Sequence, residues 1–364
     1  MVLNNLILKN FRLHINTELK PAERVNLIVG ENAQGKTSLL EAIYLICTTK
    51  SYLTNYLSEI VNYNSLNFEV EANLTTLTNN KLRIFFDKQE NKKYIFRDDK
   101  NIKNPMEYIG FFPVILLTPD DHEITKGTPK NRRKFVDGFL SQIKPNYLNN
   151  LIDYNNIIKN RSVLLNKYKE TREKYIFDEL ILWTERLANV GEYITQERIE
   201  WISSFNKYLE EIYNRIIEKK EQPKIEYKLS YNGKSLKEHL FNNLETEINK
   251  AQNLYGPHRD DLLFFINNYE LKVYGSQGQH KTFLTSLKFA QYFYYRDLFN
   301  KDSIFLMDDV FGELDSTRSQ MIAEYLNQIG QAFITITDFS NYKFLRNFTN
   351  DAIFQVQNGV VTLK

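Results

Sequence analysis

Short runs of apolar residues, separated by polar clusters, mark the first part of the chain. Each run has the length and the branched or aromatic composition of a β-strand. The runs are 2–9, 25–29, 68–74, 82–86, 94–96 and 113–117. One helix, from about Lys36 to Cys47, interrupts them, because its apolar residues recur on one side. The pattern predicts a β-rich region with hairpin turns, built around a helix.

The apolar residues take helical spacing after Thr118. Between Asn146 and Gln222 the only Gly or Pro is Gly191. A three-then-four rhythm of apolar residues runs, with one slip in phase, from 180 to 217, and an earlier helix around 147–158 could lie against it. The plain interpretation of these stripes is a helical lobe with its own core.

Strand-like alternation returns in the last part of the chain, followed by a helix, strand, helix, strand order. The strands are 224–229, 262–266, 303–307 and 332–337, and the helices are 279–299 and 316–329. A chain of 364 residues exceeds the size at which one core stops growing, so we expect two lobes. The alternation of helices and strands predicts the α/β fold class.

Composition and charge narrow the setting of the protein. With 42% hydrophobic and 25% charged residues it reads as a soluble globular protein. The single Cys47 cannot form an intramolecular disulfide, which favours a reducing compartment. No apolar stretch approaches the roughly 20 residues of a membrane helix, so we expect a cytoplasmic protein without a membrane partner. The net charge of +2 neither requires nor excludes nucleic acid, and any DNA surface must be a local patch.

The segment from Gly30 to Thr37 matches the P-loop pattern and lies between a predicted strand and a predicted helix. Two glycines let the loop curl so that backbone N–H groups face phosphate oxygens, and the helix start adds its positive dipole. Lys36 would bridge the terminal phosphates and the Thr37 hydroxyl would coordinate Mg²⁺. The residues predicted to bind ATP here are Gly30, Glu31, Asn32, Ala33, Gln34, Gly35, Lys36, Thr37 and Ser38.

Two carboxylates follow the apolar run 303–307 and have the form of a Walker B element. Asp308 would hold Mg²⁺ through water, and Asp309 would polarise the attacking water. Paired acids after a buried strand are common, so their weight comes from the P-loop upstream. Lys36, Asp308 and Asp309 are the predicted catalytic residues.

A Ser–Gln–Gly–Gln turn at 276–279 opens the next predicted helix. With the P-loop, the carboxylates and the segment 312–315, this turn resembles the ABC ATPase superfamily. The resemblance implies that Ser276, Gly278 and Gln279 contact ATP bound to a second subunit, and that Asp315 is the D-loop aspartate at the dimer seam. Taken alone, the turn could be a helix N-cap. Two chains would then enclose two ATP molecules, so that ATP binding drives dimerisation and hydrolysis reverses it.

Further motifs resemble the RecF family, a relative of SMC heads, over nearly the whole chain. They are 8–12, 127–137, 256–261, 276–279 and 306–315. The resemblance implies an ABC-type P-loop ATPase head with mixed β-sheets and a short inserted helical arm, and it places Arg12 near the phosphates. The implied domains are the head in 1–125 and 251–364 and the arm in 126–250.

Three positions depart from the ABC pattern. Asp309 stands where the usual catalytic residue is Glu, one methylene longer, which suggests slow turnover. No Gln marks the Q-loop near Thr118–Asp121, and no His follows the run 332–337, where Thr337 or Asp338 stands instead. Neither of these two roles is therefore assigned.

Five of the nine residues from 126 to 134 are basic and form a candidate DNA-binding patch. They are Lys126, Lys130, Arg132, Arg133 and Lys134. The alternatives are a solvated loop or an interface with acidic neighbours. His258 and Arg259 are interpreted as structural or interfacial residues and not as nucleotide contacts. The family resemblance implies binding of double-stranded and gapped DNA, a RecR partner, and a pathway shared with RecO and RecA.

The sequence thus predicts a weak, DNA-stimulated ATPase of DNA repair and replication. One alternative is a nucleotide-bound scaffold for DNA and partners with negligible turnover. Another, an ABC transporter's ATPase subunit, is disfavoured by the helical insertion, the basic segment and the missing Q-loop Gln.

Overall fold

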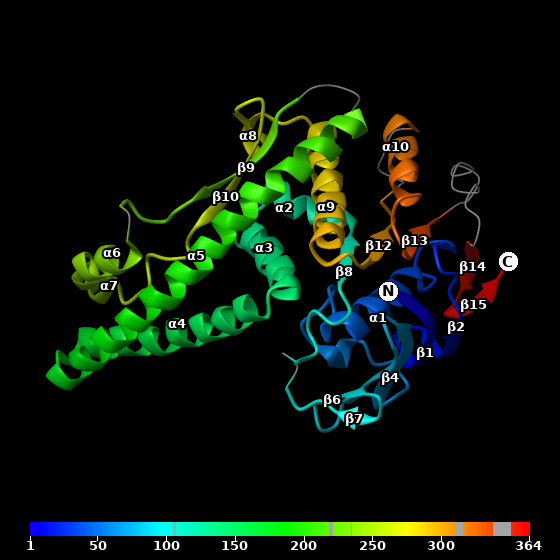
Figure 1. The fold of residues 1–364 in the computed structure, drawn as a ribbon. Helices are drawn as coiled ribbons and strands as arrows, with labels where there is room; N and C mark the ends of the chain where they lie inside the picture. Colours follow the sequence, from blue (N-terminus) through cyan, green and yellow to red (C-terminus); the bar gives the residue numbers. More distant parts are fainter. Residues whose placement is uncertain (105–106, 218–220, 234, 311–315, 338–350) are drawn as a thin grey trace. The chain divides into compact units, whose positions relative to one another are not determined.

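The computed structural model describes residues 1–104, 107–217, 221–233, 235–310, 316–337 and 351–364 (Figure 1). The chain forms two compact units. Unit 1 comprises Met1–Asp121, Ile212–Lys219 and Lys281–Lys364, and unit 2 comprises His122–Glu211 and Lys220–His280. The domain boundaries expected near 125 and 250 stay predictions. Within the described residues, no helix is long and apolar enough to cross a membrane.

Unit 1 contains an antiparallel sheet with the strand order β2-β1-β4-β5-β6-β7. Its strands are β1 (Val2–Phe11), β2 (His14–Leu19), β4 (Asn67–Thr75), β5 (Asn79–Asp87), β6 (Lys92–Arg97) and β7 (Lys100–Asn101). Alternate residues of β4 and β5 are buried, which is the pattern of a sheet with one face toward a core. The strands predicted from the sequence in this region are confirmed, but β2 was missed.

A second sheet of unit 1 has the order β15-β14-β3-β13-β12-β8. Its strands are β3 (Val25–Val29), β8 (Val114–Leu117), β12 (Ile304–Asp308), β13 (Ala332–Ile336), β14 (Ala352–Gln357) and β15 (Val360–Leu363). All neighbouring pairs are parallel except β14 with β15. Every residue of β3, β12 and β13 is buried, which explains their unbroken apolar runs. Parallel pairing brings the carboxyl ends of β3, β13 and β12 to one edge.

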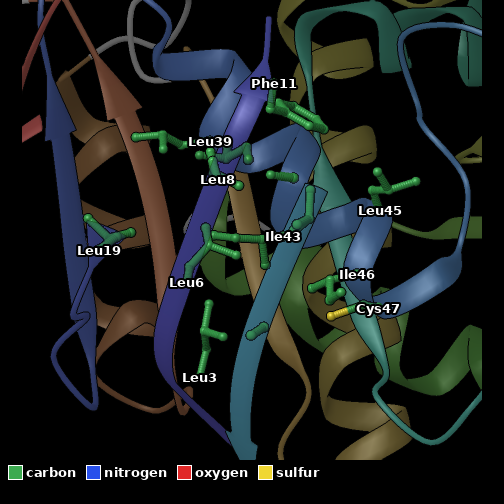
Figure 2. Close-up of a cluster of buried hydrophobic side chains, with 14 of the residues drawn as sticks. Leu3, Leu6, Leu8, Phe11, Leu19, Leu39, Ile43, Leu45, Ile46 and Cys47 are labelled. Atoms are coloured by element: carbon green, nitrogen blue, oxygen red, sulfur yellow. The ribbon is translucent and has the colours of Figure 1, made fainter. Parts of the chain in front are cut away.

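Helix α1 (Lys36–Thr48) packs with β1 in the main hydrophobic core of unit 1 (Figure 2). Leu6 and Leu8 of β1 and Ile43 of α1 are fully buried there. Cys47 is also buried, and burial raises the pKa of its thiol, so this cysteine is a core residue and not a reactive one. The apolar face of α1 therefore anchors the helix that follows the P-loop.

Helices dominate unit 2. They are α2 (His122–Lys126), α3 (Pro129–Ile143), α4 (Pro145–Thr171), α6 (Leu236–Asn242), α7 (Leu244–Lys250), α8 (Leu271–Tyr274) and most of α5 (Lys174–Ile217). The predicted helical spacing from 180 to 217 is confirmed, and the structure shows that it belongs to one continuous helix of 44 residues, α5. Unit 2 also holds a small antiparallel sheet, β11-β10-β9, formed by β9 (Pro223–Lys228), β10 (Asp261–Ile266) and β11 (Tyr269–Glu270).

Two buried arginines hold unit 2 together. The side chain of Arg161 is fully buried and donates to Glu247 at 2.6 Å and Asn253 at 2.6 Å. Arg198 donates to Asp137 at 2.8 Å and to the Pro257 carbonyl at 2.8 Å. Because a buried charge requires a partner, removing either carboxylate should destabilise the unit strongly.

Two remaining helices complete the described fold, α9 (Gln277–Phe299) and α10 (Ser316–Leu326). Phe289 of α9 stacks on Phe305 of β12, with ring centroids 4.9 Å apart. Helix α10 ends about three residues before the predicted boundary. The predicted order of helix, strand, helix and strand between 279 and 337 is confirmed, whereas β14 and β15 were missed.

Candidate functional site

A cavity of about 320 Å³ opens at the edge of unit 1 where β3 and β12 end. Gly30 follows β3, and Asp308 is the last residue of β12. The cavity is lined by Arg12, Leu13, Asn32, Ala33, Gly35, Lys36, Thr37, Ser38, Glu59, Val61, Tyr63, Asp308 and Asp309. The fold therefore brings the P-loop and both Walker B carboxylates to one cavity, although they lie more than half the chain apart.

The two glycines of the loop have separate structural reasons. A Cβ on Gly30 would lie 2.4 Å from the Val356 carbonyl oxygen, so only glycine allows the close approach of β14. Gly35 has φ +106° and is the N-cap of α1, a left-handed conformation that glycine adopts without strain. The loop thus bends around backbone positions that a side chain would block.

The ammonium group of Lys36 spans the loop from within. Its Nζ donates to the carbonyl oxygens of Gly30 at 2.6 Å and Glu31 at 2.8 Å. Burial lowers the pKa of Lys36, while the negative charges of Asp309 and Asp308 act in the opposite direction. A positive charge held inside the loop is suited to binding an anionic ligand such as phosphate.

Asp308 is surrounded by hydroxyl groups. Its Oδ1 accepts from Thr37 at 3.0 Å and from Thr335 at 2.7 Å, and its Oδ2 accepts from Tyr52 at 3.3 Å. A hydroxyl and a carboxylate at this separation form a hard-oxygen donor set, which fits Mg²⁺ held by few protein ligands together with phosphate and water. The sequence analysis missed Tyr52 and Thr335. Thr335 is the one polar residue in the otherwise apolar run of β13, which was an available signal.

Asp309 turns its backbone at the end of β12. Its φ is +47°, in the left-handed region, and its N–H donates to the Thr335 hydroxyl at 2.8 Å. This turn directs the chain out of the sheet and places Asp309 on the cavity wall. The Thr335 hydroxyl therefore donates to the Asp308 carboxylate and accepts from the Asp309 backbone N–H.

Arg12 lines the same cavity but is paired with a carboxylate. Its guanidinium donates to both oxygens of Glu41, at 2.9 Å from Nη2 and also from Nε. Glu41 is fully buried and also accepts from Ser51 at 2.5 Å, and its hydrogen bond raises the pKa of Arg12. Glu41 was missed in the sequence, where it was the only acidic residue in the apolar helix 36–47. The contact of Arg12 with phosphate stays a prediction.

The predicted signature turn begins α9 in a reciprocal cap. The Ser276 N–H donates to the Gln279 side chain at 3.0 Å, and the Gln279 N–H donates to the Ser276 hydroxyl at 3.2 Å. This is a capping box, in which two orphan backbone donors at a helix start are satisfied. The N-cap interpretation thus describes the local geometry, and Ser276 itself is exposed. Gly278 lies in the first turn of α9, and Asp315 lies outside the described residues.

The basic segment 126–134 contains two groups of residues with different surroundings. Arg132 is 4% exposed and forms a bidentate ion pair with Asp261, at 2.8 and 2.9 Å. Arg133 donates to the Asp260 carbonyl at 2.6 Å, and burial lowers its pKa. For these two arginines, the acidic-interface alternative describes the geometry. The exposed members are Lys126, Lys130 and Lys134.

His258 lies in unit 2, at a distance in sequence from the cavity residues. Tyr154 OH and His258 Nδ1 are 2.8 Å apart, and His258 Nε2 is 3.1 Å from the Asn253 carbonyl oxygen. Arg259 donates to the same carbonyl at 3.0 Å. Burial lowers the pKa of His258 to about 4, so the imidazole is neutral at pH 7. These contacts give His258 and Arg259 structural surroundings.

Comparison with known families places the chain among DNA-maintenance ATPases. The family described as "RecF/RecN/SMC N terminal domain" matches residues 2–362. The DNA replication and repair protein RecF of Chloroherpeton thalassium is 37% identical, with 96% of this chain and 98% of that protein covered. RecF of Halothermothrix orenii is 34% identical, with 100% and 99% covered.

Solved structures give the same picture of the fold. A structure of the recombination mediator protein RecF with ATP, of the RecFOR pathway, has a TM-score of 0.90 and 30% identity, with 100% of this chain and 97% of that one covered. An Smc head domain from Pyrococcus furiosus has a TM-score of 0.58 at 12% identity, with 100% and 96% covered, and shows the fold alone. The predicted α/β fold of the ABC and SMC head type is confirmed.

Proposed function

The chain belongs to the RecF family, and from this premise we propose that it is an ATP-binding, DNA-binding ATPase of DNA replication and repair. The observation that carries the proposal is the cavity of unit 1, where Lys36, Thr37 and Asp308 meet. A solved relative described with ATP supports the choice of nucleotide. Family membership removes the ground for the transporter alternative.

Loop residues from Gly30 to Ser38 are the proposed phosphate site, because part of the loop and the start of α1 line the cavity. The lining residues of the loop are Asn32, Ala33, Gly35, Lys36, Thr37 and Ser38, whereas Gly30, Glu31 and Gln34 are not among them. Lys36 would exchange its carbonyl partners, Gly30 and Glu31, for phosphate oxygens. Thr37 and Asp308 would hold Mg²⁺, which offsets the negative charge of the phosphates when bound. Thr335 and Tyr52 orient the carboxylate of Asp308 for that role.

Asp309 is the proposed general base for hydrolysis. It lies on the cavity wall beside Asp308, and its backbone is held by Thr335. Asp is shorter than the Glu usual in ABC proteins, so we propose that ATP hydrolysis is weak. We further propose that DNA stimulates it. The second candidate function, a nucleotide-bound scaffold with negligible turnover, rests on this same residue. Phosphate release with and without duplex DNA distinguishes the two.

The proposed dimer places the signature turn of one chain on ATP bound to another. Ser276 is exposed at the start of α9, where helix N–H groups and the dipole favour an anion. Gly278 and Gln279 would share this contact, together with Asp315. Ser276→Arg should therefore leave ATP binding intact and prevent ATP-dependent dimers in light scattering. Normal dimers of this variant would refute the arrangement in trans.

DNA binding would use the exposed lysines of the basic segment, Lys126, Lys130 and Lys134, for phosphate contacts. Double-stranded and gapped DNA are the proposed ligands. The description of a solved relative in the RecFOR pathway supports RecR and RecO as proposed partners. Loading of RecA through them is part of the same proposal. These roles would be carried out in the cytoplasm.

The central test is ATP binding itself. Titration of a fluorescent ATP analogue with Mg²⁺ should saturate on the wild-type chain, and Lys36→Met should weaken it by roughly 10- to 100-fold, because a charged donor to phosphate is lost. Equal affinity in both proteins would exclude the cavity as the ATP site. A melting curve of each protein controls for folding.

A further inference from the structure

Strand β2 buries two polar residues where a strand normally buries apolar ones. His14 is fully buried and Thr17 is 5% exposed. A buried polar side chain without partners is costly, so both should be hydrogen-bonded. Their partners lie in the phosphate-binding loop and in the turn between β14 and β15.

His14 binds the back of the loop at Gly35. The imidazole Nε2 lies 3.0 Å from the Gly35 carbonyl oxygen. Since a carbonyl oxygen only accepts, the Nε2 atom carries the proton in this contact. The same oxygen receives the Leu39 N–H of α1 at 3.4 Å, so His14 supplies the shorter of the two hydrogen bonds.

This contact fixes the start of α1 in a different way from a side-chain cap, because His14 donates to a carbonyl oxygen and does not accept from the first N–H groups. The N-cap of α1 is Gly35, which has no side chain, and the helix has no side-chain cap hydrogen bond. Other N-cap residues use their side chain to fix the first helical turn. The Gly35 carbonyl and the Lys36 N–H belong to one planar peptide unit, so a bond to the oxygen also sets the direction of the N–H.

A second set of contacts joins this histidine to the C-terminal hairpin. The Thr17 hydroxyl lies 3.0 Å from His14 Nδ1 and 3.1 Å from the Gly359 carbonyl oxygen. The hairpin in turn binds the loop residue before Gly35. The Gly359 N–H donates to the Gln34 carbonyl at 3.0 Å, and the Asn358 N–H donates to the Gln34 side chain at 2.6 Å.

Gly359 shows how closely these parts are packed. Its φ is +77°, and a Cβ there would lie 2.3 Å from the Leu13 carbonyl oxygen. The Gly359 Cα is itself 3.7 Å from the position of a Cβ built on Gly35. The back of the loop is therefore enclosed by β2 on one side and the hairpin turn on the other.

We propose that His14 is a positioning residue for nucleotide binding, which holds the Gly35–Lys36 peptide in the orientation that phosphate requires. Thr17 lies between His14 and the Asn358–Gly359 turn, and its single hydroxyl hydrogen serves one of these two acceptors at a time. The inference rests on the proposed ATP site and adds a part of the chain far from the P-loop in sequence. His14 does not touch the nucleotide and acts through Gly35.

Two amide substitutions test the role of His14 at nearly constant polarity. Gln carries an amide donor about as far from Cα as Nε2 of His, whereas Asn carries it one methylene nearer. His14→Gln should bind a fluorescent ATP analogue with Mg²⁺ within about threefold of wild type, and His14→Asn about tenfold more weakly, the factor of one ordinary hydrogen bond. The two variants should differ less from each other in melting temperature without nucleotide than in affinity for the analogue.

The outcomes separate the inference from the proposed function. If wild type does not bind the analogue, the ATP site and the inference both fail. If wild type binds and His14→Asn binds equally well, only the inference fails. If both variants lost the same affinity and the same melting temperature, His14 would have only a packing role. The inference would then also fail.

Thr17 supplies an independent pair if the histidine variants do not fold. Thr17→Val keeps the shape of the side chain but removes the hydroxyl, and should weaken analogue binding by about threefold to tenfold. Thr17→Ser keeps the hydroxyl and should bind as wild type does. Wild-type affinity in Thr17→Val would contradict the proposed support.

Discussion

The hydroxyl of Thr37 donates to Asp308 across 3.0 Å, joining two residues that are 271 positions apart in the chain. Thr37 is the second residue of α1, the helix after the P-loop, and Asp308 is the last residue of β12 in the parallel sheet. The contact exists because β13 lies between β3 and β12 and aligns their carboxyl ends. It is the geometric link between the two halves of the proposed ATP site.

Asp308→Asn should preserve the shape of this link and remove its charge. We expect Mg²⁺-dependent phosphate release to fall roughly 10- to 100-fold, the usual cost of losing an outer-shell group that holds a metal. Phosphate release measured over a range of Mg²⁺ concentrations provides the test. Tyr52→Phe removes only one hydroxyl donor to Asp308, so it should cause a smaller loss; an unchanged rate in Asp308→Asn would contradict the metal role.

Asp309→Asn should separate binding from hydrolysis. The variant keeps the backbone turn at φ +47° but lacks the proposed base. We expect ATP affinity within about threefold of wild type and hydrolysis slower by roughly 10²- to 10⁴-fold. The measurement combines equilibrium titration with single-turnover phosphate release. Hydrolysis at the wild-type rate would remove Asp309 from the mechanism.

Charge reversal of exposed lysines should weaken DNA binding. In the double variant Lys130→Glu, Lys134→Glu, two phosphate contacts are lost, so the slope of log affinity against log salt should decrease by about two. Gel shifts on duplex, gapped and single-stranded DNA, with and without ATP, provide the readout. Lys167→Glu is a matched control, because it reverses an exposed lysine on α4.

Arg132 gives the contrasting case within the same segment. Arg132→Gln leaves the Asp261 carboxylate without its bidentate partner, so this variant should melt at a lower temperature. A loss of DNA binding without any loss of stability would show that this arginine does contact DNA.

Unit 2 should lose stability as the pH falls below neutral. The folded-state pKa of His258 is lowered from 6.5 to about 4, so between these values the unfolded chain binds more protons than the folded one. The contribution of His258 to the free energy of unfolding is fully present above pH 6.5 and is lost as the pH falls toward 4. At pH 5 the loss from this group is about 2 kcal/mol.

Melting curves at pH 7.5 and pH 5 test this assignment. His258→Gln should show a smaller difference between the two conditions than wild type, because Gln does not titrate. An identical difference in both proteins would show that other groups cause the acid sensitivity.

Features that depend on neighbouring residues could be predicted from the sequence. The strand, loop and helix around Gly30–Thr37 follow from an apolar run, two glycines and a helical period, all within a short stretch of chain. The same holds for the long helix α5, whose helical apolar spacing persists through one slip in phase. These patterns are visible because backbone conformation and helix periodicity are local properties.

Contacts between residues that are far apart in the chain were decided by the tertiary structure. Glu41 and Thr335 read as ordinary positions until the fold brings them to Arg12 and Asp308. Strand β2 buries His14 and Thr17 against polar backbone groups and has Leu19 as its only buried apolar residue, so its sequence lacks the apolar alternation of a strand. Hydrogen bonds of this kind depend on distances in space, which local spacing along the chain does not encode.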